Sequence, residues 1–383
     1  MLADLGADVI HIEGPDSPDL GRNFGGGPAE NGLNPYFHSH NRGKRAMTLD
    51  LKTEAAREVF YKLVKSADVF VSNLRLKALE RLGVDYDTLK QYNPRLVYAR
   101  GSGYGPNGPD ADLGAMDVLG QARGGIMMGN QEEDGTPRNA GTAVADHVGA
   151  ISMAFGVMAA LLHRERTGEG QQLDSSLLGG QLCIQSFQIA TVLFNGNKPP
   201  VRKNGRKNAR AFWNSYKAGD GKWFAFGMSN DRYFPRICKV LNRLDWLEDP
   251  RYNTLKERDR NAPDLIEYLD GLFATQPRDY WIKLFSDADL LITRVNDYHE
   301  LLDDPQMTAN DYLVQVERDD GEPPVTLVGA PVLFGKTPAK IRHLAPELDQ
   351  HTEEVMLELG YEWEEIEKLR RSGAIGAHMH APA

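Results

Sequence analysis

The spacing of apolar residues near the middle of the chain predicts one long amphipathic helix. Large apolar side chains recur there at steps of three and four, which puts them on one face of a helix. They are Val148, Ile151, Phe155, Met158 and Leu162. A charged run at 164–171 ends the pattern. We therefore expect this apolar face to pack against a core.

The first half of the chain alternates short apolar runs with helical patterns. The run at 68–71 predicts a strand, and the pattern over 54–66 predicts a helix. One face of that helix carries Ala56, Val59, Phe60 and Leu63. Alternation of this kind continues to about Leu193 and is typical of an α/β fold. We expect a doubly wound, Rossmann-like parallel sheet in a large domain over 1–195.

The composition changes after Asn195, where proline, lysine, arginine and asparagine become frequent. This change predicts a linker over 196–211. The aromatic-rich region that follows, 212–305, is expected to form a smaller α+β domain. We expect the remaining segment, 306–383, to contain a further linker and then to return to the large domain.

The overall composition is typical of a soluble enzyme of the cytoplasm. With 383 residues, 41% of them hydrophobic, the chain is long enough to bury a large core. Its two cysteines, Cys183 and Cys238, are too few for a disulfide framework or a metal cluster, so no metal site is expected. The net charge of −10 argues against nucleic acid as a partner. No apolar run is expected to reach membrane-spanning length, which argues against a membrane partner.

Asp146 stands at the start of the long predicted helix, and its position has two interpretations. Aspartate before the first apolar turn of a helix is typical of an N-cap. The same helix dipole and free backbone N–H groups also keep a carboxylate ionised and able to attack as a nucleophile. Position alone leaves both interpretations open.

Several short segments keep one order and spacing over nearly the whole chain. They are 5–13 (LGADVIHIE), 49–52 (LDLK), 93–98 (NPRLVY), 103–109 (GYGPNGP), 145–146 with the run at 164–171 (RERTGEGQ), and 351–360. In these segments the chain resembles the class III CoA-transferase family, also called the L-carnitine dehydratase and bile-acid-inducible protein family.

The resemblance implies that Asp146 is the carboxylate that accepts the acyl group. In this chemistry the aspartate attacks the thioester of an acyl-CoA donor, releases CoA thiolate and becomes a mixed anhydride. The thiolate then forms an aspartyl-CoA thioester, which a carboxylic acid acceptor attacks. Coenzyme A and acyl-CoA are therefore expected as substrates, with no permanently bound cofactor. The family also implies an interlocked homodimer, in which each chain threads through the other.

Two places are candidates for CoA contacts. The turn at 41–45 is typical of a solvated surface, but the resemblance puts it near the nucleotide end of CoA. The residues implied there as phosphate contacts are Arg42, Lys44 and Arg45. The second place follows a predicted strand at 69–71, where ligands of open α/β sheets bind. The candidates there are Asn73, Leu74 and Arg81.

The dipeptide Met116-Asp117 separates two activities of the family. Acyl-CoA racemases, which look similar, use a histidine immediately before an aspartate as an acid/base group. Met116 carries no exchangeable proton, so a racemase or epimerase is the alternative function rather than the first choice. Asp117, with Met116 beside it, is either a group that positions substrate or the N-cap of a helix.

Relatives in this family carry a first strand and an active-site loop ahead of the segment that matches Met1-Leu2-Ala3. We therefore expect the large domain to lack its first strand, and the oxyanion donors stay unassigned. A relative that binds CoA without catalysis is the other alternative.

Overall fold

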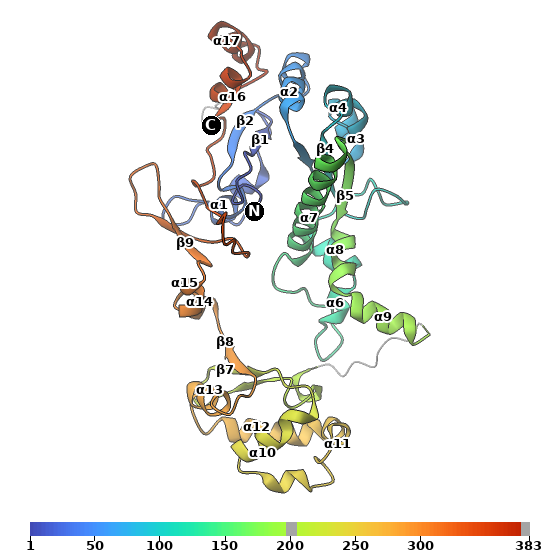
Figure 1. The fold of residues 1–383 in the computed structure, drawn as a ribbon, viewed down its shortest axis with the longest axis vertical. Helices are drawn as coiled ribbons and strands as arrows, with labels where there is room; N and C mark the ends of the chain where they lie inside the picture. Colours follow the sequence, from blue (N-terminus) through green and yellow to red (C-terminus); the bar gives the residue numbers. More distant parts are fainter. Residues whose placement is uncertain (197–204, 377–383) are drawn as a thin grey trace. The chain divides into compact units, whose positions relative to one another are not determined.

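The computed structural model describes residues 1–196 and 205–376, and its chain divides into two compact units (Figure 1). The first unit consists of Met1–Ile126, Ala140–Ser186 and Pro305–Ala383. The second consists of Met127–Asn139 and Phe187–Asp304. Half of the linker predicted over 196–211, residues 197–204, falls outside the described residues.

The first unit is a mixed α/β structure with parallel strands. A two-stranded parallel sheet pairs β1 (Ile10–Glu13) with β2 (Arg45–Thr48). A three-stranded parallel sheet has the order β3 (Val69–Ser72), β4 (Val97–Ser102) and β5 (Gln172–Ser176). Parallel neighbours need crossover connections, and helices supply them between each of these pairs.

Helix α2 (Glu54–Ser66), predicted over 54–66, is found there and connects β2 to β3. The connection from β3 to β4 contains α3 (Leu76–Leu82) and α4 (Tyr86–Tyr92), and that from β4 to β5 contains α5 (Asp117–Arg123) and α7 (Val144–Thr167). Between α5 and α7, α6 (Ile126–Gly129) belongs mostly to the second unit. Helix α1 (Pro35–Asn41) precedes β2, and α8 (Leu177–Ile184) follows β5. Thr53 caps α2 through the backbone N–H of Ala56, and α2 buries its apolar face in the same core as β2 and β4.

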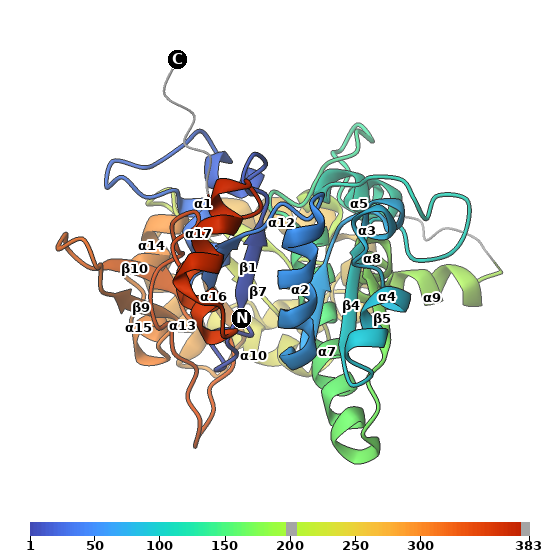
Figure 2. The same ribbon diagram turned by 90° about the horizontal axis from the view of Figure 1, so that it is seen from above.

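The C-terminal segment packs against the strands near the N-terminus. Helices α16 (Thr352–Glu358) and α17 (Trp363–Arg371) lie beside β1 and β2 (Figure 2). Val355, Met356 and Ile366 share one buried cluster with Met47 of β2. The rest of this segment contains α15 (Pro305–Ala309) and an antiparallel hairpin of β9 (Leu313–Val316) and β10 (Val325–Val328).

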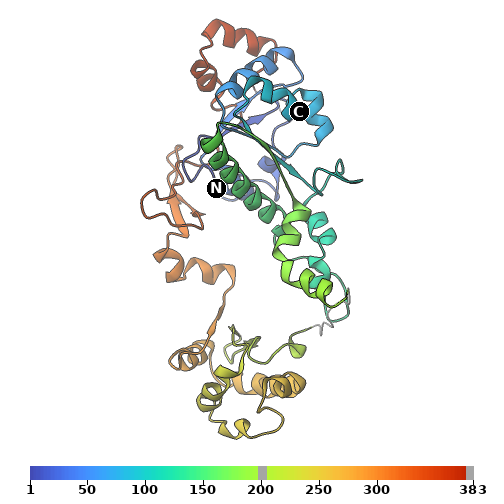
Figure 3. The ribbon, with the colours of Figure 1, turned by 45° about the vertical axis from the view of Figure 1, so that its right-hand side comes forward.

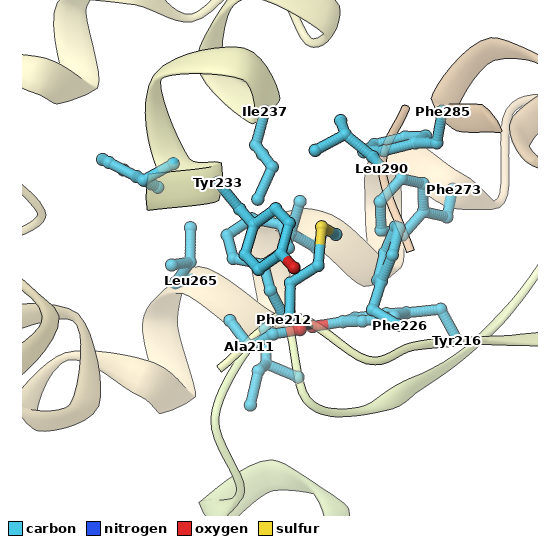
Figure 4. Packing of buried hydrophobic residues seen from close by; sticks show 14 of the residues in the cluster. Ala211, Phe212, Tyr216, Phe226, Tyr233, Ile237, Leu265, Phe273, Phe285 and Leu290 are labelled. Carbon is cyan, nitrogen blue, oxygen red and sulfur yellow. Dashed lines mark hydrogen bonds between the residues drawn. The ribbon is translucent and has the colours of Figure 1, made fainter. Parts of the chain in front are cut away.

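The second unit is built on an antiparallel sheet in the order β6 (Ser215–Lys217), β7 (Trp223–Phe226) and β8 (Ile292–Val295). Its helices are α9 (Ser186–Phe194), α10 (Phe234–Val240), α11 (Leu255–Arg260), α12 (Ala262–Phe273), α13 (Arg278–Ser286) and α14 (Tyr298–Leu302). Aromatic side chains dominate its core (Figure 4). Among them Phe226 lies 4.8 Å from Phe285 between ring centroids.

Helix α7 is the long helix predicted from the apolar spacing, but the expectation about its buried face is wrong (Figure 3, in green). The residues buried on α7 are Ala145, Gly149, Val157, Ala160 and Arg164. Of the residues at the predicted face, Val148 is half-buried and the others are exposed, with Phe155 retaining 77% of its accessible surface. Small residues face the unit because they let the helix approach closely: a Cβ at Gly149 would lie 3.3 Å from Leu177 of α8.

The same helix bears on the expectation about membranes. By length and composition, α7 is apolar enough to cross a bilayer, so the statement that no apolar run reaches that length is wrong. Helices α8 and α9 pass the same test together, with a bend of 70°. One or two such helices are weak evidence for a membrane, because a core helix of a soluble protein also passes.

Candidate active site

Asp146 lies in the first turn of α7, three residues after the N-cap position. The N-cap of α7 is Ala143, whose side chain makes no capping hydrogen bond. The N-cap interpretation of Asp146 is therefore wrong. Within residues 1–196 and 205–376, no hydrogen bond or ion pair reaches the Asp146 carboxylate, and the side chain is exposed.

The cap of α7 comes from Asp117, the first residue of α5. Its Oδ1 accepts hydrogen bonds from the backbone nitrogens of Ala145, at 2.7 Å, and Asp146, at 3.2 Å. Asp117 is not the N-cap of its own helix, because Met116 holds that position without a side-chain bond. The expectation of a local N-cap is therefore wrong, and the carboxylate instead closes the start of a different helix.

Gln121, one turn further along α5, holds the Asp117 carboxylate in place. Its Nε2 donates to Asp117 Oδ2 at 2.5 Å and to the carbonyl oxygen of Thr142 at 3.0 Å. Its Oε1 accepts from the backbone nitrogen of Ala140 at 2.9 Å. The sequence analysis did not select Gln121, although an aspartate and a glutamine four residues apart on a helix form a recognised pair.

The charges around Asp146 come from three side chains. Partial burial raises the pKa of Asp146, and the nearby charge of Asp117 raises it further. The imidazoles of His147 and His40 act in the opposite direction. The net direction is upward, so this carboxylate binds a proton more readily than an ordinary aspartate.

The two imidazoles beside Asp146 lie 5.7 Å apart between ring centroids. Nδ1 of His147 lies 2.7 Å from the carbonyl oxygen of Ala143, and Nδ1 of His40 lies 2.8 Å from that of Tyr36. A carbonyl oxygen only accepts, so Nδ1 carries the proton in each ring. The local sequence around Asp146 did not indicate that His40 and His147 lie close together, because His40 comes from α1.

The second candidate set, Asn73, Leu74 and Arg81, follows β3 as the sequence predicted. Arg81 lines a cavity of about 320 Å³ together with Arg75, Lys77, Ala78 and Asp112. Asn73 and Leu74 are exposed next to this cavity in the chain. The sequence analysis did not select Arg75, which follows Leu74 directly, or Lys77, which pairs with Asp112 at 2.9 Å.

The turn with Arg42, Lys44 and Arg45 has protein partners for each of its cations. Arg42 forms an ion pair of 2.9 Å with Asp4. Lys44 donates to Asn41 Oδ1 at 2.7 Å, and burial lowers its pKa. Arg45 bonds three carboxylates: Asp8, Glu354 and Glu358. Contact of this turn with CoA phosphates stays a prediction.

A comparison with known families connects this geometry to an activity. The model of CoA-transferase family III matches residues 1–352. The chain belongs to this family. The resemblance inferred from short segments is therefore confirmed, and the protein is a class III CoA-transferase.

Individual members of family III align over nearly the whole chain. One is (R)-2-hydroxy-4-methylpentanoate CoA-transferase of Clostridioides difficile, 33% identical, with 98% of this chain and 94% of the relative covered. Another is the succinate–glutarate CoA-transferase of Agrobacterium fabrum, 33% identical, with 94% and 90% covered. A solved CaiB/BaiF family protein from Brucella suis superposes with a TM-score of 0.82 at 30% identity, covering 94% of this chain and 93% of that one.

Met116 distinguishes the class III CoA-transferase from the racemase alternative. Its side chain is exposed at the start of α5, next to Asp117. A thioether binds no proton at physiological pH, so this position offers no acid/base partner to Asp146.

Among the described residues, no group of three or more histidine, cysteine, aspartate or glutamate side chains is arranged to hold a metal ion.

Proposed function

We propose that this family III enzyme transfers CoA from an acyl-CoA thioester to a free carboxylic acid, with Asp146 as the covalent carrier. The observation that carries the proposal is the division of roles at the start of α7. Asp117 accepts the backbone hydrogen bonds that a capping carboxylate would take. The Asp146 carboxylate, in the same turn, has no such bonds to lose when it attacks.

The steps exchange one carboxyl derivative for another. A carboxylate oxygen of Asp146 bonds to the donor's thioester carbon, the C–S bond breaks, and its electron pair leaves with the CoA thiolate. The thiolate then attacks the aspartyl carbon of this mixed anhydride and expels the donor acid as a carboxylate. The acceptor carboxylate attacks the resulting aspartyl-CoA thioester and expels thiolate again. Attack of that thiolate on the acceptor's carbonyl carbon forms the new acyl-CoA and frees Asp146.

The CoA nucleotide is proposed to bind beyond the carboxyl ends of β3, β4 and β5. Ligands of parallel α/β sheets bind at this edge. Arg75, Lys77 and Arg81 line the cavity after β3, and guanidinium and ammonium groups suit phosphates. The start of α7 is close to the same edge, because Gly149 approaches Leu177 immediately after β5. Asn73 and Leu74 are proposed contacts between the two.

The acids exchanged are proposed to be small carboxylates. Relatives carry names for (R)-2-hydroxy-4-methylpentanoate, for succinate and glutarate, and for oxalate. The acids in these names differ in size and charge, so they form a panel of candidate acceptors rather than one acid. Acetyl-CoA and succinyl-CoA, which appear in relatives' names, are suitable first donors.

The finer architecture is part of the proposal. Four apolar residues of α7, Ile151, Phe155, Met158 and Leu162, are exposed and form an apolar surface whose contact with water is unfavourable. We propose that a second copy of the chain covers this face in the interlocked homodimer that the resemblance implies. The doubly wound arrangement of the parallel strands and a cytoplasmic location are proposed on the same resemblance.

The function is tested by turnover with the acid panel. Wild-type protein is incubated with each donor and acid, and the acceptor's CoA thioester is detected by mass spectrometry. We expect at least one new thioester with wild type and none with Asp146→Asn. The matched control is Asp87→Asn, which removes a surface carboxylate paired with Lys90 and keeps turnover. Full turnover by Asp146→Asn contradicts the proposal.

The same assay in deuterium oxide distinguishes the alternatives. Deuterium at the α-carbon of the acyl-CoA without transfer to an acid favours the racemase. Binding of CoA without either product favours the relative that binds CoA without catalysis.

A further inference from the structure

Two carboxylates meet at the start of α7, and they come from different helices. Asp117 of α5 accepts the backbone N–H groups of Ala145 and Asp146. These N–H groups have no partner inside α7, and they attract negative charge. Asp117 therefore occupies the backbone N–H groups that would otherwise be open to the Asp146 side chain if it folded back onto its own helix.

The Asp117 carboxylate is held rigidly. Gln121, with 1% of its surface exposed, donates to Asp117 Oδ2 and fixes the segment before α7 through Thr142 and Ala140. The backbones of α5 and α7 are also close, because a Cβ at Gly120 would lie 2.9 Å from the Cβ of Ala145. These contacts fix the position of the Asp117 carboxylate relative to the first turn of α7.

The charges at this place change during the proposed reaction. Free Asp146 is negative, as is Asp117, and like charges at neighbouring positions repel each other. When an oxygen of Asp146 bonds to an acyl carbon, the negative charge leaves with the thiolate sulfur. The aspartyl anhydride and the aspartyl-CoA thioester are both uncharged at Asp146. Each covalent state is therefore free of the repulsion that the free carboxylate experiences.

We infer that Asp117 is a positioning residue that favours the covalent states of Asp146, by fixing the first turn of α7 and by placing a second negative charge beside the nucleophile. Gln121 is the residue that holds Asp117 in this role. This inference rests on the proposed covalent function of Asp146. It differs from the expectation that Asp117 contacts substrate, because Asp117 acts here through the helix that carries the nucleophile.

The charge beside Asp146 belongs to a set of groups that all affect its titration. Asp117 of α5 favours the protonated form of Asp146, whereas His147 of α7 and His40 of α1 favour the ionised form. Tyr36 of α1 faces the same carboxylate, and its own pKa is raised by burial and by Asp146. Removal of the Asp117 charge leaves the two imidazoles in place, so the pKa of Asp146 should fall.

The variant that separates charge from shape is Asp117→Asn. It keeps the size of the side chain and an oxygen that accepts the α7 N–H groups, but it removes the negative charge and, because an amide nitrogen does not accept, the hydrogen bond from Gln121 Nε2. Asp117→Glu keeps the charge and serves as the conservative rescue. Asp110→Asn is the matched control, because Asp110 also bonds α5, through Arg123 at 2.5 Å, and within the part of the chain that the structure describes it makes no bond to α7.

The first measurement is the fraction of protein that carries an aspartyl adduct at a fixed ratio of acyl-CoA to CoA, read by intact mass. We expect Asp117→Asn to lower the ratio of adduct to free enzyme about tenfold. Asp117→Glu should recover most of it, and Asp110→Asn should match wild type. An unchanged ratio in folded Asp117→Asn overturns the inference.

The second measurement does not need turnover. A carbodiimide with an amine labels protonated carboxyl groups, so the rate of labelling at Asp146 against pH gives its pKa. We expect the midpoint to move to lower pH in Asp117→Asn and to stay in place in Asp110→Asn. A merely structural role of Asp117 would lower the melting temperature without moving this midpoint. If Asp117→Asn does not fold, Asp117→Ser gives the same test with a smaller neutral side chain.

The outcomes separate this inference from the proposed function. An adduct on wild type that disappears in Asp146→Ala and is unchanged in Asp117→Asn overturns the inference alone. Absence of any wild-type adduct from active enzyme overturns the covalent function and, with it, the role of Asp117.

Discussion

Asp117 Oδ1 lies 3.2 Å from the backbone nitrogen of Asp146 and accepts its hydrogen bond, although 29 positions separate the two residues. Through this bond, one carboxylate caps the helix while the other carries the reactive oxygen atoms. Burial raises the pKa of Asp146, and the negative charge that this contact puts beside the nucleophile raises it further.

The raised pKa of Asp146 predicts a pH-dependent effect on stability. A carboxyl group whose pKa is raised on folding stabilises the protein below its unfolded pKa, and this contribution is lost as pH rises through the folded pKa. At pH 7 the ionised Asp146 is therefore less favourable in the folded protein than in the unfolded chain. Asp146→Asn is expected to raise Tm at pH 7, by about 1 °C.

Calorimetry of wild type and Asp146→Asn across pH checks this prediction. The difference in Tm should shrink as pH falls and should disappear below the ordinary aspartate value of 3.8. Turnover of wild type should also be lost on acidification, at a pH above that value, because the nucleophile must be ionised. A Tm difference that stays constant with pH contradicts the account.

The basic cavity after β3 predicts a defect in binding. Arg81→Gln removes a guanidinium that lines the cavity, so the KM for acyl-CoA should rise about tenfold with a much smaller change in kcat. Arg45→Gln tests the turn that the sequence suggested as the other phosphate contact. An equal rise in KM for Arg45→Gln and none for Arg81→Gln would assign the phosphates to the turn instead.

Arg42 is expected to matter for stability, because its partner is buried. Asp4 has 3% of its surface exposed, and Arg42 pairs with it at 2.9 Å. Arg42→Ala removes the nearer cation, leaves the N-terminal amine of Met1 at 3.6 Å, and should lower the free energy of unfolding by about 3 kcal/mol. The control Arg294→Ala breaks an exposed pair with Asp279 and should cost less than about 1 kcal/mol. Urea denaturation measures both, and equal losses would refute the difference.

The exposed face of α7 predicts the oligomeric state. If a second copy covers it, Phe155→Glu places a charge in that contact and should convert a dimer into a chain of 42.6 kDa. Sedimentation of wild type and variant measures this mass directly. Glu165→Gln, at the other end of α7, is the matched control and should sediment like wild type. A wild-type protein that is already monomeric and active argues against the proposed dimer.

Local periodicity was sufficient for much of the fold. The helix predicted over 54–66 is α2, and the apolar run at 68–71 overlaps β3. These elements follow from the spacing of side chains within one segment, which the sequence displays directly. The parallel pairing of β3 with β4 and of β4 with β5 follows from the helices between these strands, because parallel neighbours need a long connection.

The orientation of α7 was not predictable in this way. Periodicity gives weight to large apolar residues, and these lie on the exposed face of α7. Gly149 and Ala160 face the interior because close approach to neighbouring elements requires small side chains. A sequence pattern shows which residues share a face, but it does not show which partner that face meets.

The candidate site also contains residues that the sequence predicted and contacts that it did not. Asp146 was predicted from its position and from the family resemblance, and Arg81 from its place after a strand. The capping of α7 by Asp117, the support from Gln121 and the approach of His40 join segments far apart in the chain. These side chains come together only in the folded chain, so no local sequence pattern predicted their contacts.

The most direct test of the central claim is intact-mass analysis of the protein after incubation with acyl-CoA, with and without hydroxylamine, on wild type and Asp146→Ala. The account predicts an acyl or CoA adduct on wild type that hydroxylamine removes and that Asp146→Ala never forms. An enzyme that turns over without any adduct, or an adduct that persists in Asp146→Ala, would contradict Asp146 as the covalent carrier.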